Sequence, residues 1–210
     1  MMGFEKLAPL EIERRSFEII THELGAHAFP PEVAAVVKRV IHTTADFDYA
    51  ESLIFSPDAV NIGINALRDG AKIVTDTTMA LAGISKPALA QLGCTVRCYI
   101  ADTDVAAQAI SEGTTRAEVA AKRAVEDGAE IFVVGNAPTA LITLDRLITE
   151  NKIAPKLVIA VPVGFVNVVE AKELFLGSAT PSIVAVGRKG GSNVAAAIVN
   201  ALLYQIIERT

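Results

Sequence analysis

Five continuous runs of apolar residues constrain the fold of this chain more than any other feature of its sequence. Strands of a parallel sheet are buried on both faces, so they read as continuous apolar runs and not as alternating patterns. Between these runs, apolar residues recur at the 3.6-residue period of helices. Strands that alternate with helices predict right-handed βαβ crossovers and therefore an α/β domain. The predicted strands are residues 72–75, 95–100, 130–134, 156–161 and 182–186.

Capping residues mark several helix ends. Ser56 before Pro57 predicts a helix start, and Gly70 predicts the end of the same helix. Thr115 and Glu118 have the spacing of a capping box, in which each side chain bonds the backbone N–H of the other residue. Two further helices precede the sheet at about residues 10–24 and 31–44, and others are predicted at residues 138–151, 167–176 and 192–208.

The length of 210 residues suits one α/β domain better than two small ones. Hydrophobic residues make up 51% of the chain and charged residues 20%, which is enough apolar side chain for a sizeable core. We therefore predict a single domain over residues 1–210. It is expected to contain a doubly wound, mainly parallel sheet of about five strands, with helices on both faces and an N-terminal helical pair at about residues 10–44.

The charge distribution and the two cysteines argue against several classes of protein. The formal net charge is −5 and no run of Lys and Arg is interleaved with aromatic residues, so nucleic acid is not expected as a partner. No apolar stretch approaches the ~20 residues of a membrane-spanning helix, and the N-terminus has none long enough for a signal peptide. Cys94 and Cys98 would lie on one strand roughly 13 Å apart, too far for a disulfide. We expect buried, reduced thiols, a cytoplasmic location and no membrane partner.

Three predicted strands end in a similar way, with a glycine turn that leads into a helix start. These exits are residues 135–139, 162–166 and 187–192, and residues 75–79 follow a fourth strand. Ligands of doubly wound sheets bind outside the carboxyl ends of the strands, and helix N-termini favour carboxylates and phosphates. One site at this rim is therefore expected, although each loop taken alone is more simply explained as a tight turn. The candidate ligand-binding residues are Thr78, Met79, Asn136, Ala137, Thr139, Gly164, Phe165, Gly190, Gly191 and Ser192.

Cations at helix starts indicate an anionic ligand. Arg116 lies in the first turn of a predicted helix, where the helix dipole disfavours a cation. An arginine here is common as a surface residue, and the alternative is that it binds an anion together with the helix end. Arg188 and Lys189 precede the last predicted helix in a similar way. The sequence lacks the GxGxxG, GxxxxGK[ST], GxSxG and HExxH signatures, and its three histidines form no ligand set, so no metal site is expected.

His42 is the histidine of most chemical interest. On a helix over residues 31–44, His42 points away from the apolar stripe and Arg39 lies beside it, three residues earlier. One interpretation is a solvated surface histidine. The other is a titratable group that faces a cleft or a partner subunit, with a pKa that Arg39 lowers by like-charge repulsion. The apolar stripe itself consists of Val33, Val36, Val37, Val40 and Ile41.

Six sequence segments carry a resemblance to a known family. They are ERRSFEII (residues 13–20), RVIHTTAD (39–46), FSPDAV (55–60), GNAPTAL (135–141), PVGFV (162–166) and GGS (190–192), in this order. The chain resembles the precorrin-8X methylmutases, also called cobalt-precorrin-8 methylmutases, of cobalamin biosynthesis. The likeness covers nearly the whole chain.

The resemblance implies an isomerase that moves a methyl group between adjacent carbons of pyrrole ring C in a corrinoid tetrapyrrole, giving hydrogenobyrinate or cobyrinate. It implies no added cofactor, and a homodimer with active sites near the subunit interface. The catalytic histidine of the family corresponds to His42. Its substrate-contacting serine and arginine correspond to Ser16 and Arg39, with Arg15 beside them, and Arg116 also matches an arginine of the family. The loop at residues 135–139 is then expected to bind a peripheral carboxylate of the macrocycle through its backbone N–H groups.

Two other functions remain open at the level of the sequence. A tetrapyrrole-binding carrier would need the same carboxylate anchors, but it would have no use for a histidine that faces the ring. An α/β enzyme that acts on a phosphorylated ligand would use the same rim, although both phosphate-binding signatures are absent from the sequence.

Overall fold

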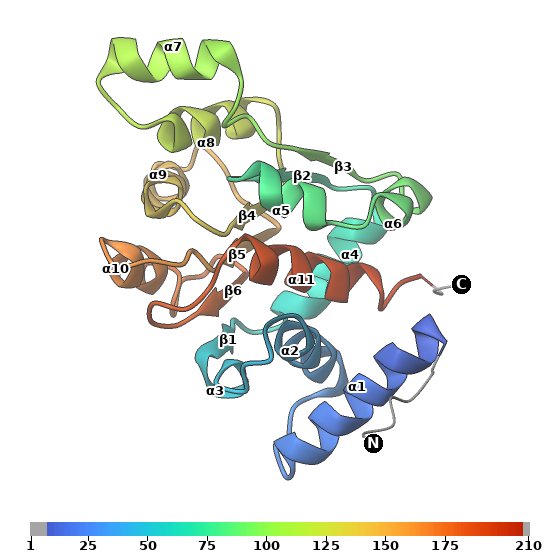
Figure 1. The fold of residues 1–210 in the computed structure, drawn as a ribbon. Helices are drawn as coiled ribbons and strands as arrows, with labels where there is room; N and C mark the ends of the chain where they lie inside the picture. The colour runs from blue at the N-terminus through green and yellow to red at the C-terminus, as the bar shows by residue number, and fades with distance from the viewer. Residues whose placement is uncertain (1–7, 208–210) are drawn as a thin grey trace, which may run out of the picture.

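The computed structural model describes residues 8–207, which form one six-stranded sheet with helices packed on both of its faces (Figure 1). The strands are β1 (Leu53–Phe55), β2 (Lys72–Thr75), β3 (Thr95–Arg97), β4 (Ile131–Val134), β5 (Leu157–Ala160) and β6 (Ser182–Ala185). The helices are α1 (Pro9–Leu24), α2 (Pro31–Thr44), α3 (Tyr49–Ser52), α4 (Ala59–Arg68), α5 (Thr78–Gly83), α6 (Lys86–Gln91), α7 (Thr103–Glu112), α8 (Arg116–Glu126), α9 (Pro138–Thr149), α10 (Val168–Glu173) and α11 (Ser192–Leu203).

The strand order β1-β6-β5-β4-β2-β3 makes the sheet doubly wound. From β2 the chain steps outward to β3, and it then returns to place β4 on the other side of β2. Strands β5 and β6 continue in that second direction, so the topological switch point lies between β2 and β4. Every neighbouring pair is parallel except β1 and β6. The predicted α/β class and the doubly wound, mainly parallel sheet are confirmed.

The sheet contains one strand that the sequence did not reveal. β1 has three residues and pairs antiparallel with β6 at the edge of the sheet, and so short a run does not stand out without its partner. Ser56 was expected to cap a helix, but it extends this strand pairing instead. The Ser182 N–H donates to the Ser56 Oγ at 2.8 Å, and the Ser56 N–H donates to the Ser182 carbonyl at 2.9 Å. Helix α4 therefore begins later than predicted, at Ala59.

Two hydrophobic cores lie on opposite faces of the sheet. Successive strand residues alternate between them: in β4, Ile131 and Val133 face one core, whereas Phe132 and Val134 face the other. The first core is covered by α2, α4, α5, α6 and α11, and α1 packs outside α2. The second core is covered by α7, α8, α9 and α10. Helix α11 is buried on nearly all sides because it packs against both α2 and α5.

The longer predicted helices are present, with differences at their ends. α2 has its predicted bounds, and α11 ends before residue 208, which lies outside the described residues. At the start of α8, the Thr115 Oγ1 accepts the N–H of Glu118 at 3.1 Å, as the predicted capping box requires. The Glu118 carboxylate instead contacts Thr114, Lys122 and Arg146. Of the two hydrogen bonds of a capping box, the one to the Thr115 side chain is therefore the one that forms. The short helices α3, α5, α6 and α7 were not predicted.

Cys94 and Cys98 flank β3 and do not lie within it. Both are free thiols: Cys94 is buried and its Sγ donates to the Leu67 carbonyl at 3.1 Å, whereas Cys98 is half-buried. The expectation of two thiols on one strand was wrong, because β3 is shorter than predicted.

Among residues 8–207, no helix combines the length and apolar character needed to cross a bilayer. The same residues contain no cluster of three or more His, Cys, Asp or Glu side chains suited to a metal ion.

Candidate active site

The loops that follow β2, β4, β5 and β6 meet at the carboxyl edge of the sheet and form one rim. They are loop 75–79, loop 135–139, loop 162–166 and loop 187–192. The Gly191 N–H donates to the Val161 carbonyl at 2.8 Å, next to loop 162–166. The hydroxyl oxygens of Thr77 and Ser192 lie 2.7 Å apart and join loop 75–79 to loop 187–192. The structure therefore brings together the strand exits that the sequence singled out.

Two glycines allow these loops to pack closely. A Cβ atom at Gly190, where φ is +156°, would lie 2.1 Å from the Val161 carbonyl oxygen. A Cβ atom at Gly135 would lie 2.9 Å from the Cα of Ser192. Neither position accepts a side chain unless the backbone moves, so glycine is required at both for packing.

A carboxylate of the protein itself lies at the start of α9. Asp76, the residue after β2, accepts the N–H of Gly135 at 2.8 Å, of Asn136 at 2.8 Å and of Ala137 at 2.7 Å. Burial raises the pKa of the Asp76 carboxyl, and the three N–H donors act against that increase. The expectation that these N–H groups bind a carboxylate of the ligand was wrong, because they are already bonded to Asp76.

The two cations of loop 187–192 also have partners. The Lys189 Nζ lies 2.6 Å from a carboxylate oxygen of Asp46 and 2.6 Å from one of Asp48. These contacts lower the pKa of Asp46 and raise the pKa of Lys189. The Arg188 guanidinium lies 5.4 Å from the centroid of the Phe165 ring. Lys189 thus ties the rim to the segment after α2, and the expectation that it is a free cation for a ligand was wrong.

A buried lysine holds loop 187–192 from inside the protein. The side chain of Lys172, on α10, donates from its Nζ to the carbonyls of Gly187 at 2.8 Å and Lys189 at 2.7 Å. Lys172 is 1% exposed, and this burial lowers its pKa to about 8. Nothing in the local sequence AKELF predicts this role, because it depends on the backbone of a loop more than ten residues away.

The imidazole of His42 is held between α1 and α2. Its Nδ1 lies 2.8 Å from the Oγ of Ser16, and its ring stacks on Phe17 with the ring centroids 5.3 Å apart. The Arg39 guanidinium donates to a Glu13 carboxylate oxygen at 2.7 Å and lies over the Phe17 ring. Because this ion pair compensates the charge of Arg39, the expected like-charge repulsion of His42 by Arg39 is not supported.

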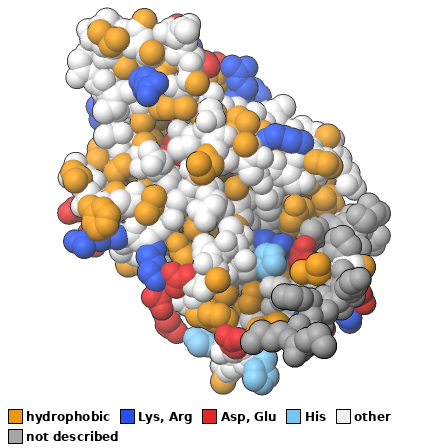
Figure 2. Space-filling view, viewed as in Figure 1, with side chains coloured by type: hydrophobic (Ala, Val, Ile, Leu, Met, Phe, Trp, Pro, Cys, Tyr) orange, Lys and Arg blue, Asp and Glu red, His pale blue; other side chains and the backbone are white. Residues whose placement is uncertain are grey.

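An open groove of about 360 Å³ lies beside His42, between α1 and the end of α2. Its walls are mainly apolar, and they include Ile12 and Ile19, which are 55% and 45% exposed. Arg15 lines the same groove and adds a cation. Figure 2 shows acidic, basic and histidine side chains gathered around apolar ones over the part of the molecule where α1, α2 and α3 lie. The groove therefore suits a ligand that has an apolar surface and charged edges.

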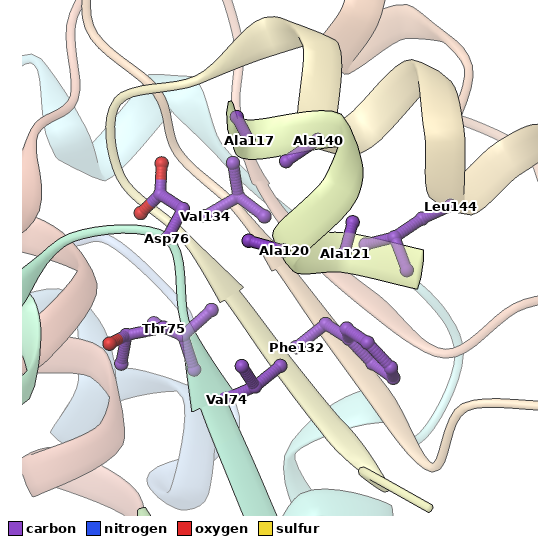
Figure 3. A pocket seen from close by; sticks show the side chains of 11 residues that line it. Val74, Thr75, Asp76, Ala117, Ala120, Ala121, Phe132, Val134, Ala140 and Leu144 are labelled. Atoms are coloured by element: carbon purple, nitrogen blue, oxygen red, sulfur yellow. The ribbon is translucent and has the colours of Figure 1, made fainter. Parts of the chain in front are cut away.

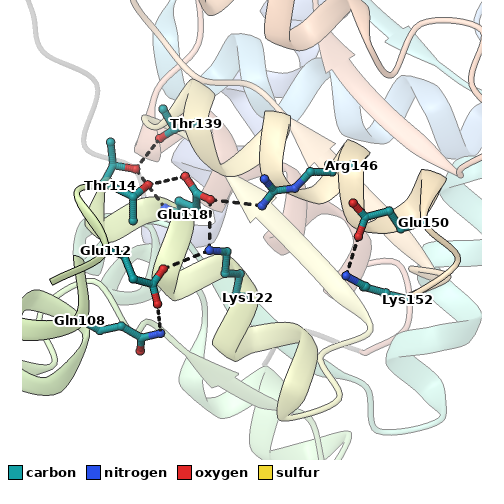
Figure 4. A network of polar contacts seen from close by, with 10 residues as sticks. Gln108, Glu112, Thr114, Glu118, Lys122, Thr139, Arg146, Glu150 and Lys152 are labelled. Carbon is teal, nitrogen blue, oxygen red and sulfur yellow. Dashed lines mark hydrogen bonds and ion pairs between the residues drawn. The ribbon is translucent and has the colours of Figure 1, made fainter. Parts of the chain in front are cut away.

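Arg116 lies at another corner of the rim. It is exposed and is the first residue of α8, and the neighbouring Thr115 Oγ1 donates to the Thr139 Oγ1 at 3.2 Å. The start of α8 is fixed by the polar network of Figure 4, in which Glu118 accepts a hydrogen bond from Thr114 and pairs with cations of α8 and α9. The hydrogen bond from Thr114 lowers the pKa of Glu118. Arg116 and Thr139 are thus held close together at the starts of α8 and α9.

The candidate residues fall into two groups in the single chain. The first group, at α1 and α2, contains Arg15, Ser16, Arg39 and His42. All residues that line the groove beside it come from positions 12–47. The second group is the rim, which carries Arg116 and the loop residues Thr78, Met79, Asn136, Ala137, Thr139, Gly164, Phe165, Gly190, Gly191 and Ser192. Lys189 links the two groups through its contacts with the segment after α2.

Comparison with known proteins establishes the family. The precorrin-8X methylmutase family model matches residues 11–205. The chain belongs to this family. A cobalt-precorrin-8 methylmutase of Salmonella typhimurium is 48% identical over 207 residues, which cover 95% of this chain and 97% of that protein. The corresponding protein of Priestia megaterium is 45% identical over 195 residues, which cover 92% and 87%. A solved structure of a precorrin-8X methylmutase from Thermus thermophilus matches with a TM-score of 0.86 at 42% identity, and it covers 92% of this chain and 94% of that one.

Besides Lys172, two residues that shape the site of this methylmutase family member were not anticipated from the sequence. Asp76 directly follows a strand at the switch point, and this place in a doubly wound sheet is the signal that could have found it. Glu13 lies within the ERRSFEII segment, but its pairing with Arg39 depends on how α1 packs against α2. The roles of Asp76 and Glu13 depend on tertiary contacts, and neither follows from the spacing of residues in the sequence.

Proposed function

We propose that this protein is the isomerase of cobalamin biosynthesis that moves a methyl group on pyrrole ring C of a corrinoid tetrapyrrole, precorrin-8X or cobalt-precorrin-8. The observation that carries the proposal is the contact between His42 and Ser16 at an apolar groove, in a chain of the precorrin-8X methylmutase family. The substrate class follows from the names of the relatives.

Ser16 suits a histidine that changes its protonation state during a reaction. A serine hydroxyl donates to an unprotonated Nδ1 and accepts from a protonated one, so the 2.8 Å contact with His42 can persist in both states. Histidine is the side chain that most readily gains and loses a proton near neutral pH. We propose that His42 gives a proton to the macrocycle, which eases the methyl shift, and takes it back from the product. Such general acid–base catalysis contributes about 10²–10⁴-fold to the rate.

The surroundings of His42 fit a flat macrocycle that carries acetate and propionate side chains. Ile12 and Ile19 offer apolar contact to the plane of the ring. Arg15 and Arg116 are exposed, and a guanidinium binds a carboxylate with two parallel hydrogen bonds. The substrate carboxylates are expected to pair with these side chains. The proposed mechanism uses no added cofactor, because reversible protonation by His42 is the only chemistry that it asks of the protein.

The relatives favour the cobalt-containing substrate. Relatives named cobalt-precorrin-8 methylmutase are 37% to 48% identical to this chain and two named precorrin-8X methylmutase are 36% and 34% identical, although the precorrin-8X methylmutase structure from Thermus thermophilus is 42% identical. We propose cobalt-precorrin-8 as the natural substrate on this basis.

We further propose that the enzyme is a cytoplasmic homodimer. The groove beside His42 is open, and its apolar residues Ile12 and Ile19 are exposed in the single chain. On the rim, Met79 and Phe165 are 69% and 81% exposed. A second copy would cover these side chains and bring the rim of one subunit toward the histidine of the other. Sedimentation equilibrium tests this proposal, and a monomer at micromolar concentration would refute it.

Visible spectroscopy tests the proposed reaction. The protein is incubated separately with the metal-free and the cobalt-containing substrate, and the spectrum is followed as the methyl group moves. We expect turnover by the wild type, and a loss of about 10²–10⁴-fold in the His42→Ala variant with its fold retained. The control is His22→Ala, which changes an exposed histidine of α1 outside the groove.

The same experiment separates an isomerase from a carrier. A carrier would change the spectrum of the bound substrate but release it unaltered after denaturation. Product recovered from the wild type and not from His42→Ala supports the isomerase. A His42→Ala variant that reacts at the wild-type rate would refute the role of His42.

A further inference from the structure

Asp76 lies at the switch point of the sheet, where a doubly wound fold usually places its ligand. The Asp76 Oδ1 accepts the N–H of Gly135, and its Oδ2 accepts those of Asn136 and Ala137. The next residue, Pro138, has no N–H, and the Ala140 N–H donates to the Ala137 carbonyl. The start of α9 therefore already holds an anion, which belongs to the protein.

Asp76 also connects the loops of the rim. Its neighbour Thr77 bonds Ser192 at 2.7 Å. The Gly135 carbonyl accepts the N–H of Val163 at 3.4 Å, and Gly135 packs directly against Ser192. A change in the bonds of Asp76 to loop 135–139 would thus be transmitted to loop 162–166 and loop 187–192.

The space behind Asp76 is small and apolar. A cavity of about 20 Å³ between the sheet and helices α8 and α9 has Asp76 at its edge, and the remaining lining side chains are apolar except for Thr75 (Figure 3). This volume holds about one water molecule. The Thr75 hydroxyl is already bonded to the Thr77 carbonyl at 3.0 Å. Backbone N–H groups are therefore the partners that this carboxylate depends on.

We propose that Asp76 is a positioning residue of the active site. It holds loop 135–139 in the conformation that presents Asn136 and Thr139 to the substrate. This inference rests on the isomerase function proposed above.

The first test compares Asp76→Asn with the control Asp69→Asn, which changes an exposed carboxylate at the end of α4. Asparagine is nearly the same size, but its amide NH₂ replaces one accepting oxygen and faces an N–H donor. We expect kcat per folded molecule to fall about 10- to 100-fold in Asp76→Asn, with KM within about threefold of the wild type. The control should match the wild type. A merely structural role would lower the folded fraction, measured by circular dichroism, and leave kcat per folded molecule unchanged.

The second test uses formate and the Asp76→Ala variant. This variant leaves the three N–H donors without an acceptor and opens space for a small carboxylate. We expect millimolar sodium formate to raise kcat of Asp76→Ala about tenfold or more, and to leave the wild type unchanged.

Two results would overturn the proposal. One is an Asp76→Asn variant with wild-type kcat and KM, and the other is a folded Asp76→Ala variant whose rate does not respond to formate. If Asp76→Ala does not fold, Asp76→Asn decides the question alone. A wild-type protein that converts neither substrate would instead refute the isomerase function, so the two failures are distinguishable.

Discussion

The buried Lys172 makes the stability of this protein depend on pH in a direction that follows from its burial. Its pKa is about 8 in the folded protein, against 10.5 for an exposed lysine. Between these pH values the unfolded chain binds one proton more than the folded chain, so the free energy of unfolding rises with pH. Because each pKa unit corresponds to about 1.36 kcal/mol, the whole effect is about 3 kcal/mol. Below about pH 8 the cost of burying the ammonium is fully present, and it declines progressively as the pH rises from about 8 to about 10.5.

Urea unfolding of the wild type and of Lys172→Met isolates this effect. Methionine has a similar size and does not titrate, so groups that titrate alike in both proteins cancel in the difference. Lys172→Met also leaves the carbonyls of Gly187 and Lys189 without their donor, at a cost that does not depend on pH. We expect the stability of the wild type relative to Lys172→Met to increase by about 3 kcal/mol between about pH 7 and about pH 10.5.

The control is Lys156→Met, which changes an exposed lysine and should show no such trend. A difference between wild type and Lys172→Met that stays constant within about 0.5 kcal/mol would refute the reasoning. A difference that falls as the pH rises would refute it as well, because the sign would then be that of a lysine stabilised in its charged form.

Two further predictions concern the rim. Arg116→Ala should weaken substrate binding about 10- to 100-fold, since a hydrogen bond to a charged group contributes about 1.5–3 kcal/mol; unchanged affinity in a spectral titration would exclude Arg116 as an anchor. Gly190→Ala should destabilise the fold by more than about 2 kcal/mol, because the new methyl group would lie 2.1 Å from a carbonyl oxygen. The control Gly177→Ala also has a positive φ but meets no atom within 4 Å, so thermal unfolding should show a smaller loss there. Equal losses in the two glycine variants would show that backbone strain and not the close contact sets the requirement.

The parts of the fold that were predicted from the sequence are those with local signals. The strands β2, β4, β5 and β6 are continuous apolar runs because both faces of each are covered, and this property is visible in a few consecutive residues. Helix α2 has its predicted bounds because its apolar stripe recurs at helical spacing. β1 could not be found in this way, because three residues become a strand here by pairing with β6, far along the chain.

The candidate site shows the same division. The glycine exits and the cations were visible locally, and so was the position of His42 on its helix. Their partners were not, because Asp76 bonds residues 59 to 61 positions away and Lys189 reaches 141 and 143 positions back. The sequence therefore predicted free N–H donors and a free cation at this rim, whereas in the folded protein these groups already bond other residues of the chain. A strand exit or a helix start shows where charge can be bound, but tertiary contacts decide whether a ligand or the protein supplies it.

The packing of α2 against α11 has a consequence for how the protein is made. The apolar stripe of α2 lies near the beginning of the chain, and the helix that covers it is Ser192–Leu203. During synthesis, α1 and α2 leave the ribosome long before α11 exists, so Val36, Val37, Val40 and Ile41 lack their main cover until almost the whole chain is complete. A chain stopped before β6 would carry His42 on a helix whose apolar face lacks the cover of α11. Premature termination should therefore yield aggregation-prone fragments and not partly active ones.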